Sequence, residues 1–234
     1  MTDHWRSYNT FLPKEKHIKS KAETFTVEGY NSLFKKILAK IIYIKFILNI
    51  YFMSLTKQGD LDMLCGIYAT INAIDCLISW NAVDRYALFN HIVGKLGTDG
   101  LLRVIQNGSG RNILSAIILK SAFEWIKKNK NRTIEAHKLK NQSKVDIEGV
   151  WNQLETFFVE NNSMCSVIFG YEHISNISHW TCIDRVSKAQ LNIKDGNIKR
   201  IHKSKFIIGS PTMEKPYSIK SSEIWMLKLQ KHIL

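Results

Sequence analysis

The apolar positions of this chain follow a helical period up to about residue 160 and then change to short alternating runs. Between residues 64 and 80 they fall three or four places apart, which predicts an amphipathic helix. The same period predicts further helices over 82–96, 99–106, 111–127 and 145–160. The apolar members of the first helix are Leu64, Ile67, Tyr68, Ile71, Ile74, Leu77 and Ile78.

Runs typical of β-strands follow the last helix, and turn-forming residues such as Asn161-Asn162 separate them. A further short edge strand is predicted within the basic stretch 127–144. Helices first and strands second indicate an α+β fold, in which an N-terminal helical part packs on a C-terminal antiparallel sheet. The cleft between the two parts is then the natural place for a site. The predicted strands span 164–171, 179–186, 190–194, 197–201, 205–208 and 223–229.

A Gly-Ser-Gly sequence, residues 108–110, precedes the helix predicted over 111–127. We expect the Ser109 hydroxyl to cap this helix, with the two glycines easing the turn. A phosphate-binding loop is the alternative. The sequence around residues 108–110, however, lacks both the lysine and the preceding strand that a phosphate-binding loop requires.

Residues 1–56 are predicted to be an accessory segment, and 57–234 the main domain. Apolar density is high over 34–55, although it is interrupted and shorter than the roughly 20 residues of a membrane span. Four interpretations stay open: a helix packed on the domain, an amphipathic surface anchor, a weak membrane span, or an upstream extension that the domain does not need. The lysines of the anchor interpretation are Lys35, Lys36, Lys40 and Lys45.

The formal net charge is +13, which favours attraction to an anionic partner such as nucleic acid or an acidic surface. The basic residues are 26 Lys and 7 Arg, however, and Arg is the better residue for phosphate and base recognition. We therefore favour a general lysine bias over a nucleic-acid site, and keep an anionic partner as the second interpretation.

Four cysteines stand at positions 65, 76, 165 and 182, and no two form a C-x-x-C pair. The spacing indicates neither a zinc site nor a thioredoxin-type site, and we expect no metal and no organic cofactor. Cys76, Cys165 and Cys182 have apolar neighbours, which is typical of small buried side chains. Free thiols match a cytoplasmic protein, although four cysteines could pair in an oxidising compartment.

Cys65 differs from the other cysteines because it begins the first predicted helix. Helix-terminal amides and the helix dipole favour a thiolate there, and the Cys65 N–H can stabilise an oxyanion. Gln58 precedes it and could supply a second oxyanion donor through its side-chain amide. Together these features make Cys65 a candidate nucleophile.

His179 begins a predicted strand 114 residues after Cys65, and Asp195 follows 16 residues later. A hairpin of 179–186 and 190–194 would bring the start of the first strand close to Asp195, which could orient the imidazole as base. His173 is the alternative to His179 as the base, and it precedes a loop-like run of residues. Asp184 is the rival acid, on the strand of His179 but facing its other side.

The motif of Gln58, Asp62 and Cys65-Gly-x-Tyr-Ala, followed by His179-Trp-x-x-x-Asp and Asp195, resembles papain-like cysteine peptidases. The most similar branch is that of the bacteriocin-processing peptidases, which cleave double-glycine leaders. The resemblance covers about residues 57–230. It implies a papain-like fold with Cys65 as nucleophile, His179 as base, Asp195 as orienting acid and Gln58 as oxyanion donor.

The resulting hypothesis is a cytoplasmic cysteine peptidase that hydrolyses a peptide or isopeptide bond through an acyl-thioester. Its partner would be a peptide or protein substrate, and membrane association of residues 34–55 stays open. Two alternatives are a transglutaminase-like acyltransferase, which also carries Cys, His and Asp in this order, and a catalytically inactive basic binding module.

Overall fold

A computed structural model describes residues 63–139, 146–162, 164–194 and 200–230 of the chain. The chain divides into two units, Met1–Asn49 and Ile50–Leu234, and all described residues belong to the second unit. The predicted segment 34–55 lies outside the described residues, as do Gln58 and Asp195.

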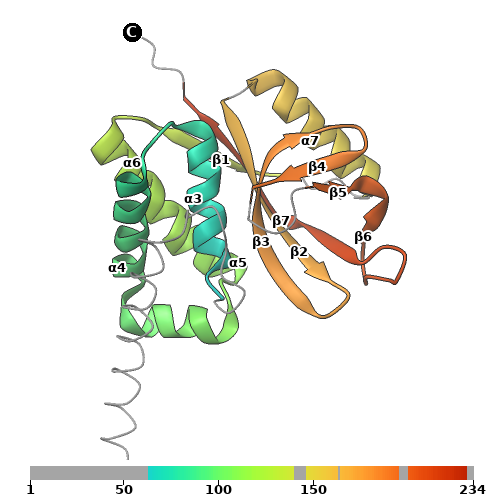
Figure 1. The fold of residues 1–234 in the computed structure, drawn as a ribbon, viewed down its shortest axis with the longest axis horizontal. Coiled ribbons are helices and arrows are strands. Elements are labelled where there is room, and N and C mark those ends of the chain that lie inside the picture. Colours follow the sequence, from blue (N-terminus) through green and yellow to red (C-terminus); the bar gives the residue numbers. More distant parts are fainter. Residues whose placement is uncertain (1–62, 140–145, 163, 195–199, 231–234) are drawn as a thin grey trace, which may run out of the picture. The chain divides into compact units, whose positions relative to one another are not determined.

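The first described elements are helices that pack against one another (Figure 1). Helix α4 begins after Asn81, whose side chain accepts a hydrogen bond from the Asp84 N–H at 2.9 Å. Gly97 has φ of 66° inside α4, so this element is two helices that meet at a kink, as the separate predictions for 82–96 and 99–106 indicated. The helices are α3 (Cys65–Leu77), α4 (Ala82–Asn107), α5 (Arg111–Ile113), a π-helical turn (Leu114–Leu119) and α6 (Lys120–Lys130).

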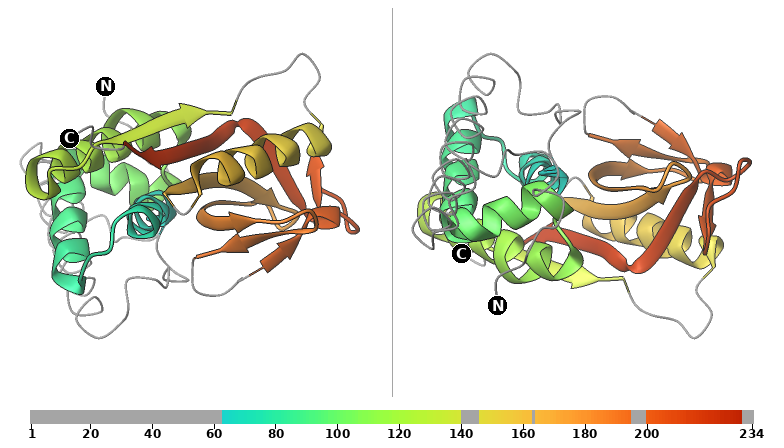
Figure 2. Two further views of the ribbon diagram at one scale, coloured as in Figure 1. Left: turned by 90° about the horizontal axis from the view of Figure 1, so that it is seen from above. Right: turned by 90° about the horizontal axis from the view of Figure 1, so that it is seen from below.

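One sheet contains all the described strands (Figure 2). Their order is β1-β7-β2-β3-β4-β5, and β6 pairs with β7. The β6–β7 pair is parallel and the other pairs are antiparallel. One further helix, α7 (Ile147–Asn161), packs on β2, β3, β6 and β7. The strands are β1 (Ile134–Lys138), β2 (Cys165–His173), β3 (Ile177–Val186), β4 (Gln190–Ile193), β5 (Arg200–His202), β6 (Phe206–Ile208) and β7 (Tyr217–Leu229).

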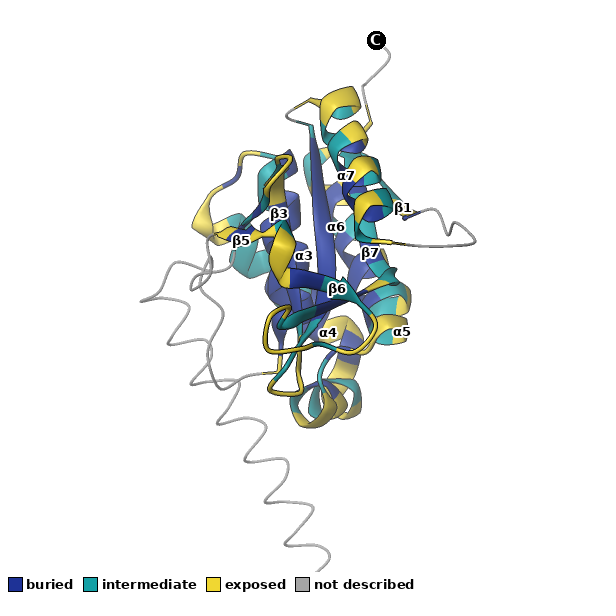
Figure 3. Cartoon of the chain, turned by 90° about the vertical axis from the view of Figure 1, so that its right-hand side faces the viewer, coloured by how far each residue is buried: buried dark blue, intermediate teal, exposed yellow. Residues whose placement is uncertain are grey.

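The sheet is covered on two sides, and its central strands are buried as a result (Figure 3). Helix α7 covers a cluster of large apolar side chains that includes Trp151, Phe169 and Phe206. Helix α3 packs on β2 and β3, and 11 of its 13 residues are buried. Helix α3 therefore lies between the sheet and other helices, namely α4 and the π-helical turn.

The structure confirms the α+β class, the helices predicted at α3, α4 and α7, and the strands predicted at β2, β3, β4 and β6, with small shifts at their ends. The π-helical turn Leu114–Leu119 divides the helix predicted over 111–127, and residues 197–199 of the strand predicted over 197–201 lie outside the described residues. Strand β1 lies at the edge of the sheet, as predicted for the basic stretch. Strand β7 begins at Tyr217, six residues before its predicted start at 223, because its first residues pair with both β2 and β6. Among the described helices, none combines the length and the apolar character that crossing a membrane requires.

The prediction that Ser109 caps the helix after it is wrong. The residue at the N-cap of α5 is Gly110, and no side chain caps this helix. Ser109 is buried instead, and its hydroxyl has no hydrogen-bond partner among the described residues. It is turned into the protein, where it contacts the start of α3.

Candidate active site

Cys65 is the first residue of α3 and is 9% exposed. Leu64 is the N-cap residue, and no described side chain caps this helix. The Leu64 carbonyl accepts the N–H groups of Ile67 and Tyr68 at 2.9 and 3.2 Å. The sequence prediction of a thiol at a helix start is therefore confirmed, and such a position favours the thiolate through the helix dipole.

His179 is the third residue of β3 and is half-buried. It pairs with Tyr171 of β2, and the centroids of the two rings are 5.4 Å apart. The described part of β4 pairs with β3 only from Ile183 onward. Over its first residues β3 is thus paired with β2 alone among the described strands, and His179 lies on this less covered part.

Helix α3 lies along β3, and contacts at its C-terminal half fix the alignment. The sulfur atoms of Cys76 and Cys182 are 3.8 Å apart. The Asn72 side chain donates to the Lys194 carbonyl at 2.8 Å, and the Lys194 N–H donates to the Cys182 carbonyl at 2.8 Å. The C-terminal half of α3 therefore faces the middle of β3.

The starts of the two elements meet at Ser109. The indole N–H of Trp180 donates to the Ser109 carbonyl at 2.6 Å. A Cβ atom on Gly66 would lie 2.6 Å from the Ser109 hydroxyl, so only a glycine fits there without a shift. The residues directly after Cys65 and directly after His179 thus contact the same serine.

These contacts put the start of α3 and the start of β3 at the same end of the interface. From Cys76 back to Cys65 the helix runs about 16 Å, and from Cys182 back to His179 the strand runs about 10 Å. Side chains alternate along a strand, so Trp180 and Cys182 face α3 while His179 is on the side of Tyr171. The His179 side chain therefore does not point into the packed interface between α3 and β3.

Gln58 and Asp195, the predicted oxyanion donor and orienting acid, lie outside the described residues. The predicted hairpin of β3 and β4 is confirmed. Lys194, the residue before Asp195, is held to β3 by the bond described above, and its ammonium contacts Asp75 of α3 at 2.6 Å. The roles of Gln58 and Asp195 stay predictions.

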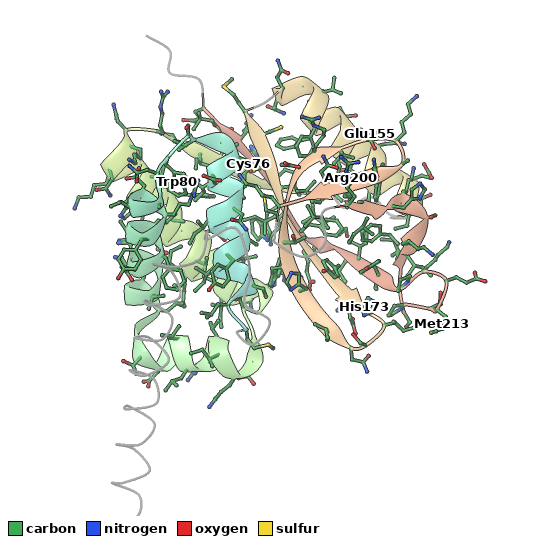
Figure 4. The ribbon with its side chains drawn as sticks, viewed as in Figure 1. Cys76, Trp80, Glu155, His173, Arg200 and Met213 are labelled. Atoms are coloured by element: carbon green, nitrogen blue, oxygen red, sulfur yellow. The ribbon has the colours of Figure 1, made fainter. Side chains whose placement is uncertain are left out.

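The alternative base, the alternative acid and two of the other cysteines have surroundings that differ from those of His179 and Cys65. The Nδ1 atom of His173 is 2.8 Å from the Ser175 hydroxyl, at the end of the β2–β3 hairpin (Figure 4). Asp184 is exposed. Burial raises the pKa of Cys165 to about 11 and raises that of Cys182 well above its usual value. Neither of these two cysteines is suited to act as a thiolate nucleophile.

Sequence reasoning missed the role of Ser109 and Trp180. The small residues at 108–110 drew attention to Ser109, but they indicated a helix cap, whereas the structure uses the serine carbonyl as an acceptor. In the sequence, Trp180 is recognisable only as the aromatic neighbour of His179. No local signal links positions that are 71 residues apart.

Two cavities, of about 440 and 660 Å³, lie beside α7 and β7. Glu160 lines both of them, and neither is lined by Cys65 or His179. No cluster of three or more metal-ligating side chains exists in the described ranges.

No family model matches the chain, and no curated protein or solved structure that was compared with it matches either.

Proposed function

We propose that the chain is a papain-like cysteine peptidase, which hydrolyses a peptide or isopeptide bond with Cys65 as nucleophile and His179 as base. One observation carries the proposal. Gly66 and Trp180, the neighbours of the two residues, both contact Ser109, so a helix-terminal thiol and a strand-borne imidazole begin at the same end of one interface. Asp195 would orient the imidazole, and Gln58 would donate to the oxyanion.

The Cys65 thiolate, paired with protonated His179, attacks the carbonyl carbon of the substrate. The Cys65 N–H at the helix start and the Gln58 amide stabilise the oxyanion. The imidazolium gives its proton to the departing amine, which leaves an acyl-thioester on Cys65. Water, deprotonated by His179, then releases the acid and restores the thiol.

The surroundings of the other cysteines support Cys65 as the nucleophile. Cys165 and Cys182 are buried, and their thiol pKa values are raised by burial. Cys76 lies in the C-terminal half of α3, far from the helix start, and its lowered pKa comes from the hydrogen bond with Cys182 and from Lys194 rather than from the helix dipole. Among the four cysteines, Cys65 alone lies at the N-terminus of a helix.

The first test is the substitution Cys65→Ala in the full chain. We expect turnover of a peptide library to be abolished, with the circular dichroism spectrum unchanged, because a small side chain at a helix start is replaced by a smaller one. His179→Ala should lower kcat by at least about 100-fold, as expected for loss of a general base. His173→Ala is the matched control and should retain activity. Equal loss in the two histidine variants would contradict the assignment.

The second test maps the reactive thiol. Brief treatment with iodoacetamide, followed by digestion and mass spectrometry, should modify Cys65 before any other cysteine. Faster modification of Cys76, Cys165 or Cys182 would overturn the nucleophile assignment. An added primary amine separates the two acyl-transfer reactions: stable amide products in place of the free acid would show a transglutaminase-like acyltransferase rather than a peptidase.

A further inference from the structure

We propose that Cys76 and Cys182 form a second thiol site, which is converted to a disulfide by exchange with a low-molecular-weight disulfide such as oxidised glutathione. Their sulfur atoms are 3.8 Å apart although the residues are separated by 106 positions. A disulfide bond is about 2.0 Å long, so the two sulfur atoms need to approach by roughly 2 Å. Side-chain rotation supplies a movement of that size.

The two thiols differ in access. Cys76 is on α3 (Figure 4). It is only half-buried, so a small disulfide can reach it. Cys182 is on β3 and has no exposed surface. The first exchange therefore takes place at Cys76, and Cys182 completes the bond from inside the protein.

The electrostatic surroundings favour the same order. The hydrogen bond with Cys182 and the Lys194 ammonium lower the pKa of Cys76. Burial and the carboxylates of Asp184 and Asp75 oppose this effect, but the net change is a lowered pKa. Burial raises the pKa of Cys182. Asp75 also holds Lys194 in place through a contact of 2.6 Å. Cys76 is thus the attacking thiolate, and Cys182 is the resolving thiol.

The exchange balances in two steps. The Cys76 thiolate attacks one sulfur atom of the small disulfide, whose S–S bond breaks, and the departing thiolate takes up a proton. Cys182 then loses its proton and attacks the Cys76 sulfur atom, which releases the second small thiol. Two protein thiols are oxidised to one disulfide, and one small disulfide is reduced to two thiols.

The bond would join α3 to β3, the two elements that begin near Cys65 and His179. It closes a long loop of chain and so restricts the unfolded ensemble. We expect an upward shift of the thermal denaturation midpoint on the order of 10 °C. The inference does not use Cys65 as a reactant, so it does not depend on the proposed peptidase activity.

The test incubates the full chain with oxidised glutathione, blocks remaining thiols with iodoacetamide, and maps the products by mass spectrometry without reduction. The expected product is a cross-linked peptide pair containing Cys76 and Cys182, with a mass lower by two hydrogen atoms. The Cys182→Ala variant should stop at the first step and keep glutathione on Cys76. The Cys165→Ala variant is the matched control, because it removes another buried cysteine and should still give the cross-link.

Three results would overturn the inference: glutathione that stays on Cys76 in the unaltered chain, a cross-link that joins Cys182 to another cysteine, or no reaction at either thiol. A cross-link without a rise in the denaturation midpoint would reject the proposed stabilisation. The Cys65→Ala variant distinguishes this site from the proposed catalytic one. It should lose peptidase turnover and still form the Cys76–Cys182 bond.

Discussion

The two covered sides of the sheet are built from different kinds of contact. Under α7, large rings pack together: Phe206 lies 5.7 Å from Trp151 and 5.8 Å from Phe169 between ring centroids. Under α3, hydrogen bonds from small polar side chains join helix and sheet, as between the Ser166 hydroxyl and the Ala73 carbonyl at 2.9 Å. The α7 side is dominated by apolar volume, whereas the α3 side adds several paired polar groups to buried apolar side chains such as Ile71 and Ile74.

This difference indicates that the α7 side mainly determines stability, whereas the α3 side mainly determines how the helix and the strands are positioned. Apolar contacts are non-directional, and neighbours can partly relax around a change in volume. A buried hydrogen bond joins one donor to one acceptor and fixes the alignment of the elements that carry them. Cys65 and Trp180 belong to the α3 side, where α3 and β3 are aligned, whereas His179 is on the side of Tyr171. We therefore expect changes on the α3 side to affect activity more than stability.

The largest expected loss of stability comes from the α7 side. Phe169 is fully buried between the sheet and α7. Phe169→Ala should lower the free energy of unfolding by about 3–5 kcal/mol, from lost burial and a residual cavity. Urea denaturation measures this. Phe158→Ala is the control, since Phe158 is only half-buried beside the same cluster, and its cost should be clearly smaller. Equal costs would reject the role given to the aromatic cluster.

On the α3 side, Gly66→Ala tests the close approach at Ser109. The added Cβ atom would lie 2.6 Å from the serine hydroxyl and 2.7 Å from its Cβ atom. The overlap should cost about 1–3 kcal/mol of stability. Turnover should also fall, because the helix start that carries Cys65 has to shift. Gly94→Ala, in α4 with no atom within 4 Å of the added Cβ, should be neutral or stabilising by up to about 1 kcal/mol. A harmless Gly66→Ala would contradict the tight contact.

Trp180→Phe removes the donor to the Ser109 carbonyl while keeping a ring. The buried carbonyl loses a partner, which should cost about 1–3 kcal/mol, and kcat should fall because His179 is the preceding residue. Trp80→Phe is a matched control: Trp80 is 8% exposed against 7% for Trp180, and its indole N–H has no partner among the described residues. Similar stability losses in both variants would show that ring volume, not the hydrogen bond, is what Trp180 supplies.

The smallest expected effect is at an exposed ion pair of α7. Lys203 contacts Glu148 at 2.6 Å, but the Glu148 side chain is 69% exposed. Glu148→Gln should change the free energy of unfolding by less than about 1 kcal/mol, and added salt should remove the difference. A double-mutant cycle with Lys203→Gln measures the pair itself. A coupling energy as large as the Trp180→Phe effect would contradict the comparison between the two sides.

Much of the local structure follows from the sequence. The 3.6-residue period predicted α3, both parts of α4, and α7, because burial of one apolar face imposes that spacing. The hairpin of β3 and β4 followed from alternation and turn residues. The early start of β7 could not be predicted. Its first residues, which include Ser218, pair with both β2 and β6, and their strand conformation depends on these pairings rather than on an apolar pattern.

For the candidate site, the sequence by itself determined that Cys65 begins a helix and that His179 is near the start of a strand, because these are properties of short segments. Only the tertiary structure decided that the starts of α3 and β3 meet at Ser109, and that Cys76 lies beside Cys182. Such contacts join positions far apart in the chain. They depend on how the helical layer packs on the sheet, and no local period carries that information.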